Sequence, residues 1–211
     1  MTASTSTPIP NASATDVEAV TAIVLCGGRG QRLGGADKPL LLVAGKPIVV
    51  HAIERLTPQV QCVLVSHAPG NDAYQNLGLD CVADHSAHEG PIAGLAACLP
   101  HVKTPRLLTW PGDAPLPPPD LISRLAPACR AVGAVSVTAG SRRQNATLLM
   151  TQVRAAELVA AFTSGERAPR HWLDRESIPS VAFPESAFLD ADTQGDLAQI
   201  EAHFRCAPGE G

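Results

Sequence analysis

Short apolar runs alternate with segments of helical periodicity through most of the chain. Residues 21–25 (TAIVL) form the first such run, which is closed by glycine and is typical of a buried strand. Residues 47–56 follow with apolar side chains at helical spacing. Strands that alternate with helices pair mostly in parallel, because each helix carries the chain back across the sheet. The pattern predicts an α/β fold: a three-layer domain with a mostly parallel sheet and helices on both faces.

The same patterns predict the remaining elements. Further strands are expected at 60–66, 79–83, 106–109, 134–138, 147–150 and 178–183, and further helices at 91–99, 118–126, 153–162, 169–176 and 193–204. Pro127 should end or kink the helix that begins at 118, because proline lacks the amide hydrogen that a helix interior requires. No internal repeat or strong break divides these elements.

Length and composition indicate a single folded domain. The chain has 211 residues and 45% hydrophobic residues but only 3% aromatic ones, so its core must be aliphatic. Residues 1–18 are rich in Ser, Thr, Ala and Pro and are expected to form a disordered N-terminal leader. The folded domain is expected to span 19–207.

Charge and cysteine content limit the possible partners and compartment. The formal net charge of −4 disfavours binding along a nucleic-acid backbone, which requires a basic surface. No run approaches the roughly 20 apolar residues of a membrane helix. The six cysteines include no CxxC pair, which is typical of reduced thiols. We therefore expect a cytoplasmic protein with neither nucleic-acid nor membrane partners.

Polar residues follow several predicted strands. A glycine-rich segment comes directly after the first strand, and Ser66, Asp84 and Asp113 stand at or after the ends of later ones. The carboxyl ends of parallel strands lie at one edge of the sheet, where open α/β folds bind their ligands. The pattern predicts a ligand site at that edge.

The glycine-rich segment 25–38, LCGGRGQRLGGADK, combines five glycines with two arginines and a lysine. Glycines allow backbone amides to close on phosphate oxygens, and the cations supply charge to hold a triphosphate and its leaving pyrophosphate. The spacing matches neither GxGxxG nor GxxxxGK[ST], which disfavours a Rossmann dinucleotide site and a Walker loop. The segment predicts binding of a nucleoside triphosphate; the alternative is a mobile surface loop with solvated charges.

This segment resembles the signature of the MobA-like nucleotidyltransferases, written roughly LAGGxSxRMGxxK. Further segments agree in order: GPIAG at 90–94, PGDAP at 111–115 and residues 188–193 before the last predicted helix. The resemblance implies the Rossmann-like nucleotidyltransferase fold and, within the family, a molybdenum cofactor guanylyltransferase. Such an enzyme transfers GMP from GTP to the molybdenum-molybdopterin cofactor and releases pyrophosphate. Molybdoenzymes or cofactor-insertion proteins are then conceivable partners.

The resemblance also implies roles for individual residues. Nucleotide binding is expected from Leu25, Cys26, Gly27, Gly28, Lys38, Ser66, Asp84 and Asp113, and catalysis from Arg32, Lys38 and Asp113. In the family the Gly27-Gly28 pair accompanies guanine, whereas cytidylyltransferases tend to carry alanine at the second position. Asp113 is expected to hold Mg²⁺, a cofactor that binds through one or two carboxylates together with phosphate oxygens and water.

Several residues depart from the family pattern. Cys26 replaces the usual alanine, and Ser66 stands where asparagine is usual. Asp190 and Asp192 replace the asparagines of an Asn-x-Asn-Thr motif, and residues 142–148 lack the expected proline. Arg142 and Arg143 would bind an anionic acceptor or belong to a solvated turn. These departures leave two alternatives open: a cytidylyl- or other nucleotidyltransferase acting on a phosphorylated acceptor, and a degenerate member that binds nucleotide without catalysis.

Overall fold

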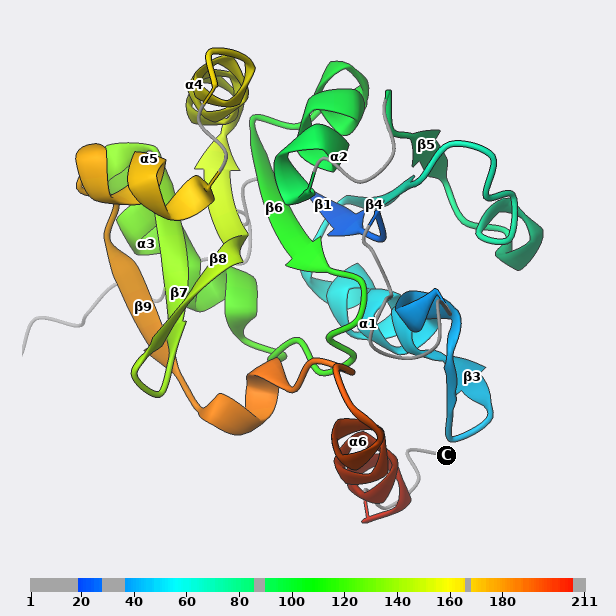
Figure 1. Ribbon diagram of the computed structural model, residues 1–211. Helices are drawn as coiled ribbons and strands as arrows, with labels where there is room; N and C mark the ends of the chain where they lie inside the picture. Colours follow the sequence, from blue (N-terminus) through cyan, green and yellow to red (C-terminus); the bar gives the residue numbers. More distant parts are fainter. Residues whose placement is uncertain (1–18, 28–36, 86–89, 166–167, 207–211) are drawn as a thin grey trace, which may run out of the picture.

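A seven-stranded sheet forms the centre of the protein, whose computed structural model describes residues 19–27, 37–85, 90–165 and 168–206. The strand order is β5-β4-β1-β6-β8-β7-β9, and every neighbouring pair is parallel except the two that involve β8 (Figure 1). The strands are β1 (Val20–Leu25), β4 (Cys62–His67), β5 (Cys81–Ala83), β6 (Arg106–Pro111), β7 (Ala134–Ala139), β8 (Arg142–Thr151) and β9 (Ser180–Phe183).

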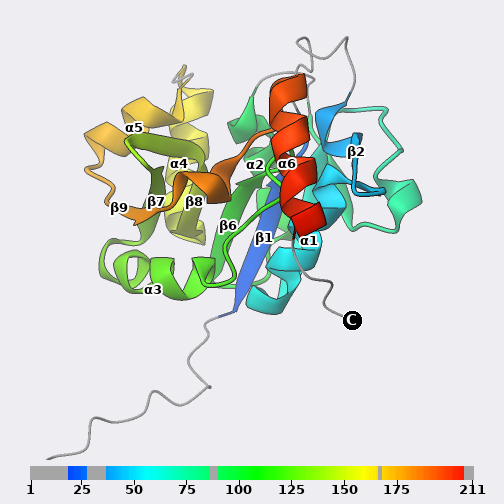
Figure 2. The same ribbon diagram turned by 90° about the horizontal axis from the view of Figure 1, so that it is seen from below.

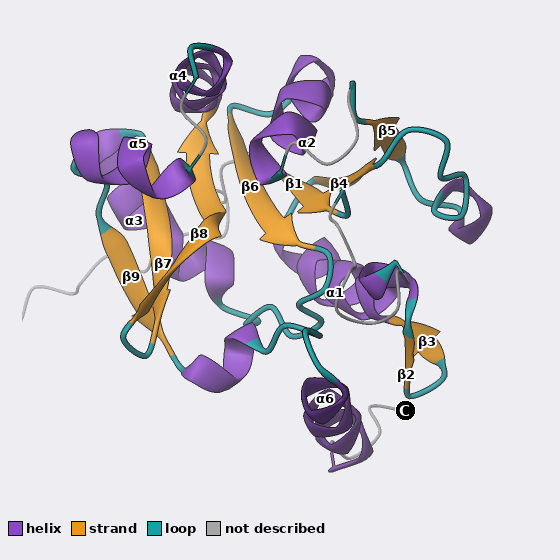
Figure 3. Ribbon diagram, in the orientation of Figure 1, coloured by secondary structure: helices purple, strands orange, loops and turns teal. Residues whose placement is uncertain are grey.

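Helices cover both faces of this sheet (Figures 1 and 3). One apolar cluster joins the sheet to α1 (Ile48–Leu56) and α3 (Leu121–Val132). A second cluster joins the opposite face to α2 (Pro91–Cys98), α4 (Gln152–Thr163) and α5 (Pro169–Arg175). The view from below shows the sheet between these helix layers (Figure 2). The predicted fold class is therefore confirmed.

Strand β1 shows why its sequence is apolar except at Thr21, which is buried as well. Ala22 and Val24 lie in the α1/α3 cluster, whereas Ile23 lies in the cluster on the α2 face. All three side chains are fully buried. Because a strand alternates its side chains between the two faces, a central strand covered on both sides needs apolar residues at nearly every position.

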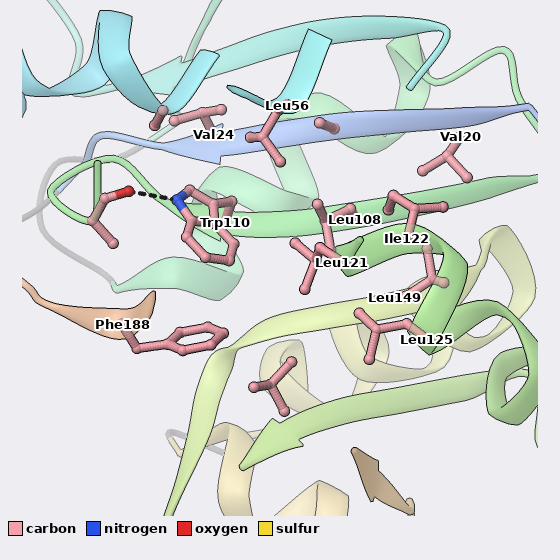
Figure 4. Packing of buried hydrophobic residues seen from close by; sticks show 14 of the residues in the cluster. Val20, Val24, Leu56, Leu108, Trp110, Leu121, Ile122, Leu125, Leu149 and Phe188 are labelled. Atoms are coloured by element: carbon pink, nitrogen blue, oxygen red, sulfur yellow. Dashed lines mark hydrogen bonds between the residues drawn. The ribbon is translucent and has the colours of Figure 1, made fainter. Parts of the chain in front are cut away.

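The α1/α3 face contains one large aromatic side chain near the carboxyl end of β6. Trp110 is fully buried and packs against Phe188, with ring centroids 5.3 Å apart (Figure 4). Its indole nitrogen donates a 2.8 Å hydrogen bond to the Ala114 carbonyl oxygen. This bond satisfies the buried indole N–H and ties the chain that follows β6 to the core.

A small satellite lies beyond the main sheet, where β2 (Leu42–Val43) and β3 (Lys46–Pro47) form a two-stranded hairpin. The last helix, α6 (Gln194–Cys206), packs against this hairpin (Figure 3). Val43, Ile48, Ala191 and Ile200 make their shared apolar cluster. The packing of α6 therefore holds the chain just before it, which approaches the carboxyl edge of the sheet.

Two sequence predictions need correction. Helix α3 does not end at Pro127 but continues to Val132. Proline has no amide hydrogen to donate to the carbonyl oxygen of Ser123, one turn earlier. Because Pro127 and Ser123 are both exposed, water can bond that carbonyl oxygen instead, and the helix continues. Strand β8 begins at Arg142 rather than 147, because its polar first half pairs with β7 as a hairpin that apolar periodicity does not reveal.

None of the described helices is both long and apolar enough to cross a membrane.

Gly133 ends α3 in the left-handed region, with φ +81°, and its amide bonds to the Cys129 carbonyl at 2.8 Å. Substitution Gly133→Ala should lower the free energy of unfolding by about 1 kcal/mol, because alanine adopts this conformation with strain. The added Cβ would also lie 3.0 Å from Arg154 Cγ. Urea denaturation measures the loss.

Gly195→Ala provides the matched control. This glycine lies within α6, where an added Cβ meets only Thr193 Oγ1 at 3.5 Å. Alanine there should leave the protein as stable or slightly more stable. Equal stability of the two variants would contradict the assignment of Gly133 as a required helix cap.

Candidate active site

The strand register brings three loops together at one edge of the sheet. Leu25 at the end of β1 pairs with Ser66 on one side and with Pro111 on the other. Beyond these pairs the Cys26 amide donates to the Ser66 carbonyl at 2.8 Å, and the Gly112 amide donates to the Leu25 carbonyl at 2.9 Å. The glycine-rich segment and the Asp113 turn therefore leave the sheet side by side, as the positions of the strand ends predicted.

A pocket of about 230 Å³ opens at this edge. Its lining includes five of the predicted site residues: Leu25, Cys26, Gly27, Lys38 and Asp113. The other described residues that line it are Asp37, Pro39, Pro91, Pro111 and Ala146. The pocket thus joins the two ends of the glycine-rich segment to the turn after β6.

Ser66 and Asp84 lie directly beside the pocket. The buried Ser66 hydroxyl donates to Asp84 Oδ1 at 2.7 Å, and a Cβ built on Gly27 would lie 2.5 Å from Asp84 Oδ2. Burial raises the pKa of Asp84, opposed by the Ser66 hydrogen bond and by His67. Any larger residue at position 27 would crowd this carboxylate, whose Oδ2 lies beside Gly27.

Lys38 lies between two carboxylates. It opens one turn of 3₁₀ helix, Lys38–Leu40, and its ammonium lies 4.0 Å from Asp113 Oδ2. The same ammonium donates to Asp192 Oδ1, from the chain just before α6. The lysine side chain is only 13% exposed, so its charge is poorly solvated and depends on these partners.

Negative charge accumulates around this lysine. Burial raises the pKa of Asp113, opposed by Lys38 and reinforced by Asp192. Burial also raises the pKa of Asp190 to about 6, and the charges of Asp113 and Asp192 add to the rise, while Arg142 lowers it. Among the described residues, three carboxylates therefore lie near Lys38, and Arg142 acts on one of them as well.

The family model of the MobA-like NTP transferase domain matches residues 22–180 of this chain. The chain belongs to this family. A molybdenum cofactor guanylyltransferase from Cupriavidus taiwanensis is 36% identical over 195 residues, covering 87% of this chain and 96% of the relative. An enzyme of the same name from Shewanella sp. is 32% identical over 190 residues, covering 88% and 96%. This MobA-like chain is therefore a nucleotidyltransferase.

Solved structures share the fold of this MobA-like enzyme at lower identity. Molybdopterin-guanine dinucleotide biosynthesis protein A from Archaeoglobus fulgidus has a TM-score of 0.69 and 22% identity, covering 88% of this chain and 98% of that chain. A 4-diphosphocytidyl-2C-methyl-D-erythritol synthase from Anaerococcus prevotii has a TM-score of 0.70 at 12% identity, with coverage of 90% and 100%. The architecture is therefore shared by proteins that are named for different products.

The predicted residues divide into three groups within the MobA-like site. Leu25, Cys26, Gly27, Lys38, Ser66, Asp84 and Asp113 gather at the pocket or directly beside it. Gly28 and Arg32 lie outside the described residues. Arg143 points elsewhere, because its guanidinium bonds Ser136 Oγ at 2.8 Å and pairs with Asp174 at 3.1 Å.

The cysteine in the motif is an inert packing residue. Cys26 is buried, and burial raises the pKa of its thiol well above the ordinary value, with Asp37 adding to the rise. The thiol therefore stays protonated and is a poor nucleophile. This agrees with its interpretation as a substitute of nearly the same size for alanine.

Sequence reasoning missed the contact between Lys38 and Asp192. The two residues are 154 positions apart, so no local pattern joins them. The available signal was the pair of carboxylates at 190 and 192 where the family has asparagines. Those acidic side chains lie near Lys38, which lines the pocket.

The raised pKa of Asp190 predicts a pH-dependent stability. The pKa of Asp190 is raised from 3.8 to about 6, so between these pH values the folded state binds more protons than the unfolded state. The free energy of unfolding therefore falls as the pH rises through this range, and the loss is complete above the folded-state pKa. Replacing the carboxylate by Asp190→Asn should raise the free energy of unfolding at pH 8 by on the order of 1 kcal/mol. The gain should shrink as the pH falls from 6 toward 4.

Urea denaturation at pH 8 and pH 4.5 measures this difference. Asp72→Asn, at an exposed position, serves as the control that should show no such pH-dependent gain. If Asp190→Asn stabilises equally at both pH values, the burial and charge crowding around Asp190 do not act as inferred.

Proposed function

We propose that this chain transfers GMP from GTP to the molybdenum-molybdopterin cofactor, forming molybdopterin guanine dinucleotide and releasing pyrophosphate. The observation that carries the proposal is the meeting of Lys38 and Asp113, 4.0 Å apart, in the pocket at the carboxyl edge of the sheet. Relatives that bear the guanylyltransferase name match almost the whole chain at 32–36% identity, which supports the same assignment.

The nucleoside half of GTP fits the side of the pocket formed by Leu25, Cys26 and Gly27, beside which Asp84 lies. An ionised carboxylate only accepts hydrogen bonds, and the guanine edge offers an N–H and an amino group as donors. Asp84 Oδ1 already accepts from Ser66, so Oδ2 is the oxygen for the base. Ser66 therefore acts by orienting Asp84, and this role needs only a hydroxyl where the family commonly has asparagine.

The triphosphate fits beside Lys38. Its ammonium sits in the pocket with carboxylate partners that phosphate oxygens can replace. Gly28 and Arg32, from the undescribed part of the segment, would contribute a backbone amide and a second cation. Transfer of a nucleotidyl group needs mainly positioning and neutralised charge. We assign Lys38 and Arg32 to that neutralisation.

Asp113 suits a divalent cation, for which we propose Mg²⁺. Its carboxylate lines the pocket and lies near Asp190, whose pKa is raised by burial and further by the charges of Asp113 and Asp192. Among the described residues no three His, Cys, Asp or Glu side chains are arranged to hold a metal, so phosphate oxygens and water must complete the coordination. When bound, Mg²⁺ supplies charge stabilisation on the phosphates.

The reaction follows from these placements. An oxygen of the acceptor's terminal phosphate forms a bond to the α-phosphorus of GTP, and the bond from that phosphorus to the β-phosphate oxygen breaks. Lys38 holds the phosphates in line and stabilises the charge that leaves with pyrophosphate. Asp84 fixes the nucleoside so that the α-phosphorus stays at one position.

Reduced cysteines, free wherever their side chains are described, accord with our proposal of a cytoplasmic location.

A panel of the four nucleoside triphosphates tests the proposal directly. Purified protein with Mg²⁺ and molybdopterin-loaded acceptor should release pyrophosphate from GTP far faster than from CTP, ATP or UTP. Asp113→Ala should reduce the turnover by about 100-fold or more, because it removes the proposed metal ligand. Asp120→Asn, an exposed carboxylate in the same connection after β6, should leave it unchanged.

Preference for CTP would favour the cytidylyltransferase alternative. Unchanged cellular function in folded Asp113→Ala, checked by circular dichroism, would favour a binding role without catalysis.

Asp84→Asn tests base recognition separately from catalysis. The substitution replaces one acceptor oxygen by an amino group, so one donor of guanine loses its partner or meets another donor. The KM for GTP should rise about tenfold or more, with a smaller effect on kcat. Asp80→Asn, at an exposed position before β5, is the matched control. An unchanged KM for GTP in Asp84→Asn would remove Asp84 from the nucleoside site.

A further inference from the structure

The carboxylate of Asp37 is held by the connection between β4 and β5. Its Oδ2 accepts a 2.8 Å hydrogen bond from the Tyr74 hydroxyl and a 2.6 Å bond from Asn71 Nδ2. Both residues lie in the chain between β4 and β5. Tyr74 is 37 positions and Asn71 is 34 positions further along the sequence than Asp37. Two segments distant in sequence are therefore joined at the last residue before Lys38.

Tyr74 is placed for this contact with little freedom. The residue is fully buried, and its ring stacks on His67 at the end of β4, with centroids 5.7 Å apart and planes inclined by 25°. A phenolic hydroxyl buried in an apolar cluster needs a partner. Asp37 supplies that partner, and the Cys26 thiol also interacts with the same hydroxyl. In return Asp37 receives a donor whose position the core fixes.

Asp37 in turn determines how Lys38 enters the pocket. The Asp37 carbonyl accepts the Leu40 amide at 3.0 Å and so starts the turn that contains Lys38. The Asp37 side chain bonds to Tyr74 and Asn71, while the Lys38 side chain reaches Asp113 and Asp192. Adjacent residues are thus anchored to different parts of the fold, which fixes the backbone from which the lysine extends.

The same bonds moderate a charge in the pocket. Asp37 lines the pocket together with Lys38. A carboxylate without donors at this place would repel a triphosphate, whereas hydrogen bonds from a phenol and an amide offset part of its charge.

We propose that Tyr74 and Asn71 are positioning residues for Lys38: they hold the Asp37 carboxylate so that the lysine meets the triphosphate. Neither side chain belongs to the glycine-rich segment, and neither lines the pocket itself. The proposal rests on the assignment of Lys38 to the triphosphate made above. It predicts that the hydroxyl of Tyr74 matters for phosphate binding and not for the nucleoside.

The experiment is a double-mutant cycle between Tyr74→Phe and Lys38→Ala. Calorimetry measures the Kd for GTP with Mg²⁺ and the Kd for guanosine, which has no phosphates. Tyr74→Phe should weaken GTP binding by about five- to tenfold and leave guanosine binding unchanged. In the Lys38→Ala background the same substitution should cause a clearly smaller loss, because most of its effect passes through the lysine and only the charge of Asp37 acts independently of it.

Thr104→Val is the control for the loss of a buried hydroxyl. Thr104 lies before β6, at the opposite edge of the sheet, where its hydroxyl donates to the Arg106 carbonyl at 2.6 Å. It should lower stability without changing either Kd. Asn71→Ala repeats the test at a partly exposed side chain in case Tyr74→Phe does not fold.

Equal weakening of GTP and guanosine, or additive losses in the double variant, would overturn the proposal while leaving the proposed function intact. Unaltered GTP binding by folded Tyr74→Phe and Asn71→Ala would do the same. If wild-type protein fails to bind GTP, or Lys38→Ala binds it as well as wild type does, the assignment of Lys38 falls and this inference falls with it.

Discussion

The hydrogen-bond register of β1 is the constraint on which the site depends. Leu25 is paired on both sides, with Ser66 and with Pro111, so the residues after these strands emerge at one level. A shift of one residue would turn every side chain of the strand to the opposite face. The apolar clusters on the two faces of β1 prevent such a shift, because each position is already buried against a helix layer. Burial of the core therefore places the glycine loop beside Asp113.

This dependence explains which parts of the site were predictable from sequence. Strands and the residues that end them leave local patterns, so Ser66, Asp84 and Asp113 were found together with the fold. The glycine-rich segment has its own composition, and its resemblance to a family assigned the residues within it. The polar first half of β8 and the continuation of α3 past Pro127 depend on pairing and solvation, which periodicity does not report.

The contacts that sequence reasoning did not find are long-range and polar. Tyr74 bonds to Asp37, and Asp192 bonds to Lys38. The sequence around these residues has no local pattern that would pair them. Only the folded arrangement shows that both pairs converge on the same lysine segment. The result is a lysine whose described ionic partners are carboxylates, which accords with our proposal that phosphate oxygens replace them when substrate enters.

The distance along the chain between Lys38 and Asp192 also bears on synthesis. A ribosome releases the glycine-rich segment early and the residue that contacts its lysine 154 positions later. Domains acquire structure from the N-terminus onward as they are made, and contacts of long sequence separation form late. The strands that border the pocket can therefore assemble before α6 has docked, whereas the ionic surroundings of Lys38 are completed only when the end of the chain packs onto the β2–β3 hairpin. A nascent or truncated chain would present Lys38 in a different electrostatic state from the finished protein.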